Sequence, residues 1–325
     1  MKKLMTGLLA GAMALMAAGA ADAQDALRLQ LKWVPQAQFA GYFVAEAKGF
    51  YDEENLDITI LPGGPNVAPE QVIAGGGADV IVDWMGGAAA ARDKGVPLVN
   101  IAQPFKRGGL MLICPKEHGV NSVADFKGKT IGVWFFGNEY PFFAWMNKEG
   151  LSTAEGGDIT VLQQSFDVQP MIQNQAQCIH VMTYNEYGQA LDAGYSPENL
   201  TIFNYSELGN DLLEDGLYVM EDTLSDPAKV DAYTRFVRAS MKGWQYALEN
   251  PDEAAQIVVD SDETGAATLD HQKYMMGEVA KLVDPNDAAL DLATYERTVK
   301  ALVDQKIISK APEGAYTTVI TDALK

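Results

Sequence analysis

Short apolar runs alternate with helical patterns along the first third of the chain, and polar or glycine-containing turns separate them. The runs predict strands at residues 27–31, 57–61, 78–82 and 98–102. The patterns between them predict helices at about 41–48, from 70 onward and at 86–94. Alternation of strands and helices with short turns is typical of parallel strands covered by helices.

The alternation restarts after Gly108 and Gly109. Further strands are predicted at residues 110–113, 130–134, 159–162 and 178–182. Helices are predicted between and after them, at 139–148, 168–174 and 187–192. The second half of the pattern therefore forms its own α/β unit.

A strand at 217–220 could return the chain to the first unit, and the remainder is helical from Pro227 onward, with Ser225 or Asp226 as the N-cap. The pattern predicts an α/β protein with two lobes and a cleft between them. The predicted division is a first lobe begun by 24–109, a second lobe of 110–212, and a return to the first lobe with C-terminal helices at 213–325.

The amino terminus has the parts of a secretory signal peptide. Lys2 and Lys3 precede an uncharged run of Leu, Met and Ala, and Ala21-Asp22-Ala23 fits the small-x-small pattern of a cleavage site. Residues 1–23 are therefore predicted to be removed, and the protein is expected in the periplasm. A membrane anchor is the weaker alternative, because the run is short of the roughly 20 residues that a span needs.

Charge and length narrow the class of protein. The chain has 44 acidic and 24 basic residues and a formal net charge of -20, which becomes -21 without residues 1–23. Nucleic acid and anionic lipid surfaces would repel such a protein, so neither is expected as a partner. The 302 residues after the cleavage site again favour two lobes. A monomer is expected.

The cysteines and histidines form no metal or catalytic motif. Cys114 and Cys178 could pair in an oxidising compartment, but two separately buried thiols are expected. The three histidines lack metal-ligand spacing, so no metal is expected. The sequence also lacks a P-loop, a G-x-G-x-x-G turn after a strand, a G-x-S-x-G elbow and an H-E-x-x-H helix. No cofactor and no catalytic residue is predicted.

Polar and aromatic side chains gather after four of the predicted strands, and open α/β sheets bind ligands beyond the carboxyl ends of their strands. Each of the four clusters combines an aromatic ring with amide or carboxylate groups. The candidate ligand-binding residues are Trp33, Gln36, Gln38, Asp83, Trp84, Trp134, Asn138, Glu139, Tyr184 and Glu186.

This mixture of side chains suits a flat ligand with hydrogen-bond donors. Aromatic rings can sandwich a planar ring, with about 0.5–1.5 kcal/mol per stacked pair beyond burial. A carboxylate can accept a charge-assisted hydrogen bond from a ring amino group. We expect Trp33 and Tyr184 to face each other from opposite lobes. Lys32 is the only cation in the clusters, so a neutral or cationic heterocycle is favoured over an anion, although helix N-termini could still hold one.

Structural roles compete with ligand binding at several positions. Trp145 and Trp244 are interpreted as packing residues. Asp83 is equally well explained as the N-cap of the following helix, and Glu139 as compensation of a helix dipole. Glu186 shares that second explanation but lies between two tyrosines, which favours ligand contact.

Several segments resemble substrate-binding proteins of the thiamine-pyrimidine-synthase-like group, whose binders include sulfonate, thiamine-precursor and riboflavin carriers. The matching segments are LQLKWVPQAQFAGYFVAEAKGFY at 29–51, together with 62–68, 77–79, 126–133 and TYNEY at 183–187. The similarity covers most of 27–250 and is specific as a set. It implies a type II periplasmic-binding-protein fold with the ligand in the cleft between the lobes.

The importer branch of this group binds a formylated aminopyrimidine thiamine precursor, whose ring lies between aromatic side chains and meets acidic groups. The matching positions are Trp33, Tyr184 and Glu186. Lys32 stands where that branch often has an aspartate, and LKWVPQAQFAGYF at 31–43 is closer to riboflavin-binding relatives. The resemblance therefore leaves aminopyrimidine and riboflavin as alternative ligands.

Enzymes of the same group hold pyridoxal phosphate on a lysine, with a histidine four residues later. The matching positions are Asp83 and Gly87, and their cysteine-rich iron-binding stretch corresponds to 210–214, which has no cysteine. The resemblance thus implies a solute-binding protein that docks on an ABC permease in the inner membrane, and not a thiamine pyrimidine synthase. Its lobes are expected to close by a hinge near Gly108, Gly109 and the residues before Gly216.

Overall fold

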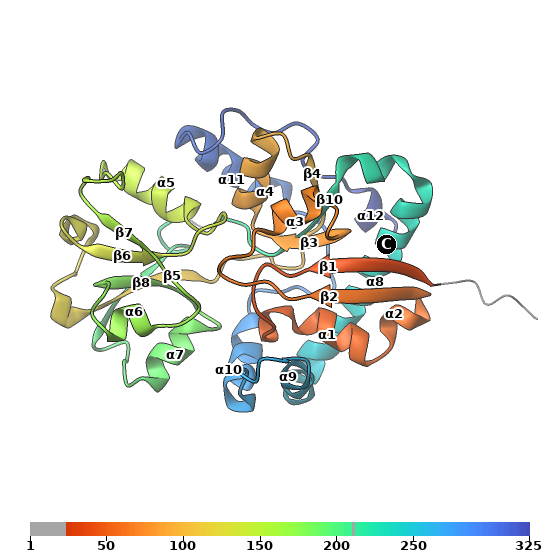
Figure 1. The fold of residues 1–325 in the computed structure, drawn as a ribbon, viewed down its shortest axis with the longest axis horizontal. Helices are drawn as coiled ribbons and strands as arrows, with labels where there is room; N and C mark the ends of the chain where they lie inside the picture. Colours follow the sequence, from red (N-terminus) through yellow and green to blue (C-terminus); the bar gives the residue numbers. More distant parts are fainter. Residues whose placement is uncertain (1–23, 210–211) are drawn as a thin grey trace, which may run out of the picture.

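The computed structural model describes residues 24–209 and 212–325, and it forms two α/β units that lie beside each other (Figure 1). The predicted signal peptide lies outside the described residues. The chain passes from the first unit to the second after β4 and returns after β9. Among the described residues, no helix combines the length and the apolar character that a membrane span requires.

The first unit is built on a five-stranded sheet in the order β2-β1-β3-β10-β4. Its strands are β1 (Asp25–Gln30), β2 (Leu56–Leu61), β3 (Val80–Asp83), β4 (Leu98–Ala102) and β10 (Gly216–Met220). Strands β1, β2 and β3 are parallel, whereas β10 is inserted antiparallel between β3 and β4. The strand predicted to return the chain to the first unit is therefore present. Gly216 at its amino end lies opposite Asp83 at the carboxyl end of β3.

Four helices of the first unit follow its parallel strands. They are α1 (Ala40–Ala47), α2 (Phe50–Glu53), α3 (Pro69–Ala74) and α4 (Met85–Asp93). Gly49 takes the left-handed conformation, with φ of 70°, between α1 and α2. The chain turns there because glycine adopts positive φ without the steric cost of a Cβ.

The second unit has a sheet in the order β7-β6-β8-β5-β9. Its elements are β5 (Leu110–Pro115), β6 (Thr130–Val133), α5 (Tyr140–Lys148), β7 (Thr160–Gln163), α6 (Gln169–Ile172), β8 (Cys178–Met182), α7 (Glu186–Asp192) and β9 (Leu200–Asn204). Strand β5 is antiparallel to both neighbours, so the sheet is mixed rather than parallel throughout. The sequence analysis missed β9, because only Leu200 of this edge strand is fully buried and its alternation is weak.

The C-terminal helices cover the first unit. They are α8 (Pro227–Glu249), α9 (Pro251–Asp260), α10 (Leu269–Val279), α11 (Leu292–Asp304) and α12 (Val319–Asp322). Asp226 caps α8 as predicted, since its side chain accepts a hydrogen bond from the Ala228 N–H at 2.9 Å. Helix α8 crosses α1 so closely that a Cβ on Gly243 would lie 2.0 Å from the carbonyl oxygen of Gly41. Trp244 is fully buried at this crossing, in agreement with its interpretation as a packing residue.

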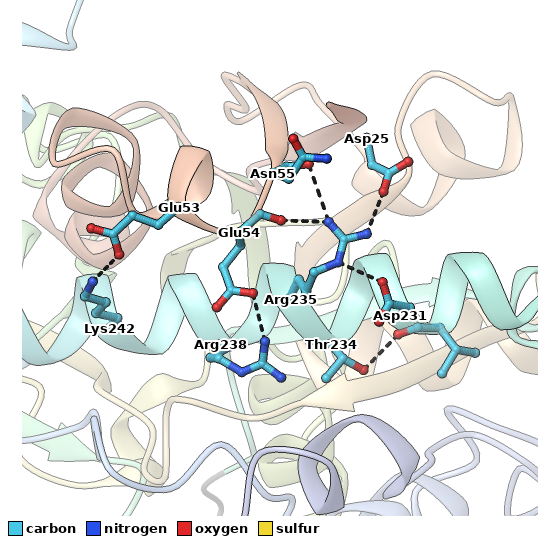
Figure 2. Close-up of polar contacts among 10 residues, drawn as sticks. Asp25, Glu53, Glu54, Asn55, Asp231, Thr234, Arg235, Arg238 and Lys242 are labelled. Atoms are coloured by element: carbon cyan, nitrogen blue, oxygen red, sulfur yellow. Dashed lines mark hydrogen bonds and ion pairs between the residues drawn. The ribbon is translucent and has the colours of Figure 1, made fainter. Parts of the chain in front are cut away.

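Arg235 of α8 ties the start of β1 and the α2–β2 turn to this helix (Figure 2). Its guanidinium donates to the carboxylates of Asp25 and Asp231 and to the carbonyl oxygen of Glu54, at 2.5, 2.8 and 2.7 Å. Arg238 extends the row with an ion pair to Glu54 at 2.8 Å. Exposed pairs of this kind contribute at most about 1 kcal/mol each, so they orient the first strand more than they stabilise the fold.

Cys114 and Cys178 form a disulfide, which corrects the expectation of two separate thiols. The pairing register of β5 and β8 places Ile113 opposite Ile179 and therefore Cys114 opposite Cys178. Their Cα atoms are 4.3 Å apart, and both side chains are fully buried. The disulfide was not predicted because the two cysteines are 64 residues apart in sequence and come together only through the pairing of two antiparallel strands.

Replacement of both cysteines, in Cys114→Ala/Cys178→Ala, is expected to lower the free energy of unfolding by up to roughly 4 kcal/mol, because closing a loop of this length restricts the unfolded chain. Urea unfolding with and without a reductant measures the effect. The wild-type midpoint should fall with reductant and the variant midpoint should not move. Equal midpoints for oxidised wild type and variant would contradict the prediction.

Candidate functional site

A pocket lies between the two sheets, at the carboxyl ends of β1, β3, β6 and β8. It contains about 560 Å³ of space, including the solvent at its mouth. Nine of the ten candidate residues line it: Trp33, Gln36, Gln38, Asp83, Trp84, Trp134, Asn138, Tyr184 and Glu186. Glu139 lines a neighbouring cavity instead, and its carboxylate accepts a hydrogen bond from the Gly137 N–H at 2.8 Å.

Aromatic rings form much of the pocket wall. Trp33 of the first unit and Tyr184 of the second both line it. The Trp134 indole N–H donates to the carbonyl oxygen of Ser165 at 2.7 Å, which fixes its ring, and Trp33 meets that ring edge to face at a centroid distance of 5.9 Å. Trp33 is half-buried and therefore borders the solvent. Rings held in this way can enclose a planar ligand with little loss of side-chain freedom on binding.

Lys32, which lines the pocket, forms a buried ion pair. The Lys32 ammonium is 2.7 Å from one carboxylate oxygen of Asp215, and Gln38 donates to the other oxygen at 2.7 Å. Both charged side chains are more than nine-tenths buried. Lys32 also lies 4.0 Å above the centre of a Trp84 ring, a favourable cation–π position. The cation is therefore satisfied by groups of the protein itself.

Two further carboxyl groups line the pocket without a cation of their own. Burial raises the pKa of Asp83 well above its ordinary value, and the charge of nearby Glu70 raises it further. Burial also raises the pKa of Glu186 to about 7, against hydrogen bonds from the Met182 N–H at 3.0 Å and the Asn185 amide at 2.7 Å. A hydrogen-bond donor or a positively charged group would be attracted to this part of the pocket.

Three buried polar atoms on the lining residues have no hydrogen-bond partner in the described protein: Asp83 Oδ2, Trp84 Nε1 and the Tyr184 hydroxyl. The other oxygen of Asp83 accepts from the Trp84 N–H at 2.8 Å, and Trp84 itself occupies the N-cap position of α4. The alternative interpretation of Asp83 as that N-cap is therefore wrong. Buried polar atoms are almost always paired in native proteins, with protein groups or ordered water, so these three atoms are available to hydrogen-bond a molecule in the pocket.

The two units touch main chain to main chain beside the pocket. A Cβ on Gly137, in the loop after β6, would lie 2.7 Å from the Cα of Gly87 in α4. Gly137 has φ of 97°, and Phe136 before it has φ of 60°, which is a costly conformation for a residue with a side chain. The loop is thus held in an unusual conformation where the two units meet.

Sequence reasoning missed part of the lining. Phe135 and Phe136 line the pocket although only their neighbours Trp134, Asn138 and Glu139 were proposed. Four residues between 64 and 69, for which no ligand contact was predicted, also line it. Asp215, the partner of Lys32, was not predicted because it precedes β10, and the prediction was restricted to positions after strands. An antiparallel strand brings its amino end to the edge where its parallel neighbours end, so the position before β10 is as close to the pocket as the positions after β1 and β3. The described residues include no group of three or more His, Cys, Asp or Glu side chains that could hold a metal ion.

The raised pKa of Glu186 predicts that the protein loses stability as the pH rises. Folded and unfolded Glu186 are both protonated below about 4.5. The free energy of unfolding falls as the pH rises from there to about 7, where only the unfolded group is ionised, and the loss is complete above the folded pKa of about 7. The full effect is at most roughly 3 kcal/mol of unfolding free energy at higher pH.

Unfolding in urea between pH 4.5 and 8 measures the effect, with Glu186→Gln as the comparison. As the pH rises, the free energy of unfolding of the wild type should fall relative to that of the variant. Only this slope is diagnostic, because the amide also loses a hydrogen bond at every pH. A difference that is constant with pH would exclude titration of Glu186 in this range.

Comparison with known proteins agrees with the two-lobe architecture. The alkanesulfonate-binding protein SsuA from Xanthomonas axonopodis pv. citri, bound to MOPS, superposes with a TM-score of 0.68 at 14% sequence identity, over 90% of this chain and 98% of that one. At this identity the match shows the fold alone, and the fold is that of the periplasmic binding proteins.

Curated relatives are more similar in sequence. The formylaminopyrimidine-binding protein of Halalkalibacterium halodurans is 27% identical over 256 residues, or 74% of this chain and 72% of the relative. The riboflavin-binding protein RibY of Chloroflexus aurantiacus is 28% identical over 252 residues, or 74% and 68%. Relatives also include 4-amino-5-hydroxymethyl-2-methylpyrimidine phosphate synthases. The family described as NMT1/THI5 like matches residues 36–254, two thirds of the chain, and the protein therefore belongs to this family.

Proposed function

We propose that this protein is the solute-binding component of an ABC importer and that it captures a planar nitrogen heterocycle, such as the aminopyrimidine precursor of thiamine. Residues 1–23 would direct it to the periplasm, and its loaded form would dock on a membrane permease. The first lobe would comprise 24–109 and 213–325 and the second 110–212, with the hinge in the two crossing segments.

The pocket is the observation that carries the proposal. Three tryptophans and a tyrosine provide flat apolar faces, while Asp83 and Glu186 provide buried carboxyl groups with raised pKa values. A heterocycle with ring nitrogens and an amino group can stack on the former and donate hydrogen bonds to the latter. Relatives named for binding formylaminopyrimidine and riboflavin support the same class of ligand.

Charge argues against an anionic ligand. Two carboxyl groups, Asp83 and Glu186, line the pocket, and Lys32 of the lining is already paired with the buried carboxylate of Asp215. A sulfonate or nitrate would meet these groups with no free cation among the described lining residues. Similarity of fold to a sulfonate-binding protein therefore does not extend to the ligand.

Catalysis of the synthase type lacks its main residue. The position that matches the cofactor lysine is Asp83, and the position that matches the histidine is Gly87. Lys32 is the lysine in the pocket, and its ammonium is held by Asp215 at 2.7 Å. These residues favour a carrier over an enzyme.

Direct binding tests the ligand class. Formylaminopyrimidine or riboflavin should raise the unfolding temperature of the purified protein, whereas taurine and nitrate should leave it unchanged. Only the ring compounds can both stack on the aromatic side chains and donate hydrogen bonds to the carboxyl groups. Native mass spectrometry of protein taken from the periplasm provides an independent measurement. Preference for taurine or nitrate over both ring compounds would overturn the proposal.

Truncation of the half-buried tryptophan tests the stacking role. Trp33→Ala is expected to weaken binding of the ring compound about tenfold or more, while Trp33→Phe keeps most of the affinity because a ring remains. Isothermal titration measures both dissociation constants. Phe166→Ala is the control, since Phe166 is 52% exposed and lies outside the pocket lining. Equal affinities for Trp33→Ala and the control would exclude Trp33 from the site.

A further inference from the structure

Helix α10 belongs to the first unit but also contacts the second. It packs on α9 and on the short 3-10 helix Ala37–Phe39, where the Ala37 N–H donates to Gln272 at 2.7 Å. On the other side, His271 Nε2 lies 2.8 Å from the amide oxygen of Asn185, and the Tyr274 hydroxyl donates to the carbonyl oxygen of Thr183 at 2.7 Å. Figure 1 shows α10 at the edge of the first unit that faces α7.

These two contacts hold a segment that is central to the pocket. Thr183 and Asn185 flank Tyr184, and Asn185 precedes Glu186. The Asn185 amide donates to the Glu186 carboxylate at 2.7 Å and to the Gln36 side-chain oxygen at 3.1 Å. Neither His271, Tyr274 nor Asn185 lines the pocket itself. Asn185 is hydrogen-bonded to Gln36 and Glu186, which do line it. His271 and Tyr274 contact the same segment from outside.

The hydrogen bonds form a chain with a single direction. Because the Asn185 nitrogen donates to Gln36 and Glu186, its oxygen must accept, and His271 Nε2 is therefore the donor. Gln36 then donates to Gln38 at 2.7 Å, and Gln38 donates to Asp215 at 2.7 Å. Each amide is fixed by its neighbours, since turning one around would break bonds on both sides.

The chain crosses between the units twice, at His271–Asn185 and at Asn185–Gln36. These two bonds hold only while the units are together, because Asn185 belongs to the second unit and its two partners to the first. The Gln36–Gln38 and Gln38–Asp215 bonds lie within the first unit. Bonds that exist in the closed form alone stabilise that form relative to the open one. They should slow opening without affecting the first encounter with a ligand.

We infer that α10 is a latch, in which His271 and Tyr274 act as positioning residues that hold the Thr183–Glu186 segment on the first unit and so slow ligand release. This role rests on the proposed function, because it requires that the pocket closes around a ligand. Helix α10 would therefore affect ligand binding although none of its residues lines the pocket.

Stopped-flow tryptophan fluorescence tests the latch, with whichever of formylaminopyrimidine and riboflavin binds the wild-type protein more tightly. His271→Leu and Tyr274→Phe are each expected to speed dissociation about threefold to tenfold, the effect of one net hydrogen bond. Association rates should stay within about twofold of wild type. His271→Gln should restore slow dissociation, since its side-chain amide can donate from nearly the same position as Nε2.

Tyr246→Phe is the matched control, because the Tyr246 hydroxyl donates to Glu253 within the first unit at 2.7 Å. Its dissociation rate should equal that of wild type. Unchanged dissociation in His271→Leu and Tyr274→Phe, or dissociation from His271→Gln as fast as from His271→Leu, would overturn the latch. Failure of the wild-type protein to bind either compound would instead overturn the proposed function.

Discussion

The interlobe pocket is lined by more acidic than basic side chains, and most of its properties follow from this imbalance. Lys32 is committed to Asp215, so Asp83 and Glu186 remain without a cation and retain their protons to unusually high pH. A buried carboxylate without a partner is costly. The protein can avoid that cost by keeping the proton, or by accepting hydrogen bonds from a guest. The aromatic walls restrict the guest to a flat one.

The antiparallel insertion of β10 makes this arrangement possible. A parallel strand in the same place would bring its carboxyl end to the pocket, whereas β10 brings its amino end there, with Asp215 just before Gly216. Asp215 has φ of 51°, a conformation that aspartate tolerates better than most residues. The returning chain thus supplies the counter-ion for Lys32 at the point where it enters the first sheet.

Much of the fold and most of the pocket lining could be predicted from the sequence because they depend on local signals. Periodicity locates the strands, and residues directly after a parallel strand lie at one edge of the sheet, which is why Trp33, Asp83 and Trp134 were found. Asp215, the disulfide and the His271 contact could not be predicted in this way. Each depends on the pairing or docking of segments far apart in the chain, and no local pattern encodes that register.

The contact between Gly87 and Gly137 limits how far the two units can approach. Because neither residue has a side chain, nothing there can compress or change rotamer, and the main chain acts as a rigid stop. A side chain at position 137 would overlap the main chain of α4, so the loop after β6 and this helix can keep their present separation only with glycine there.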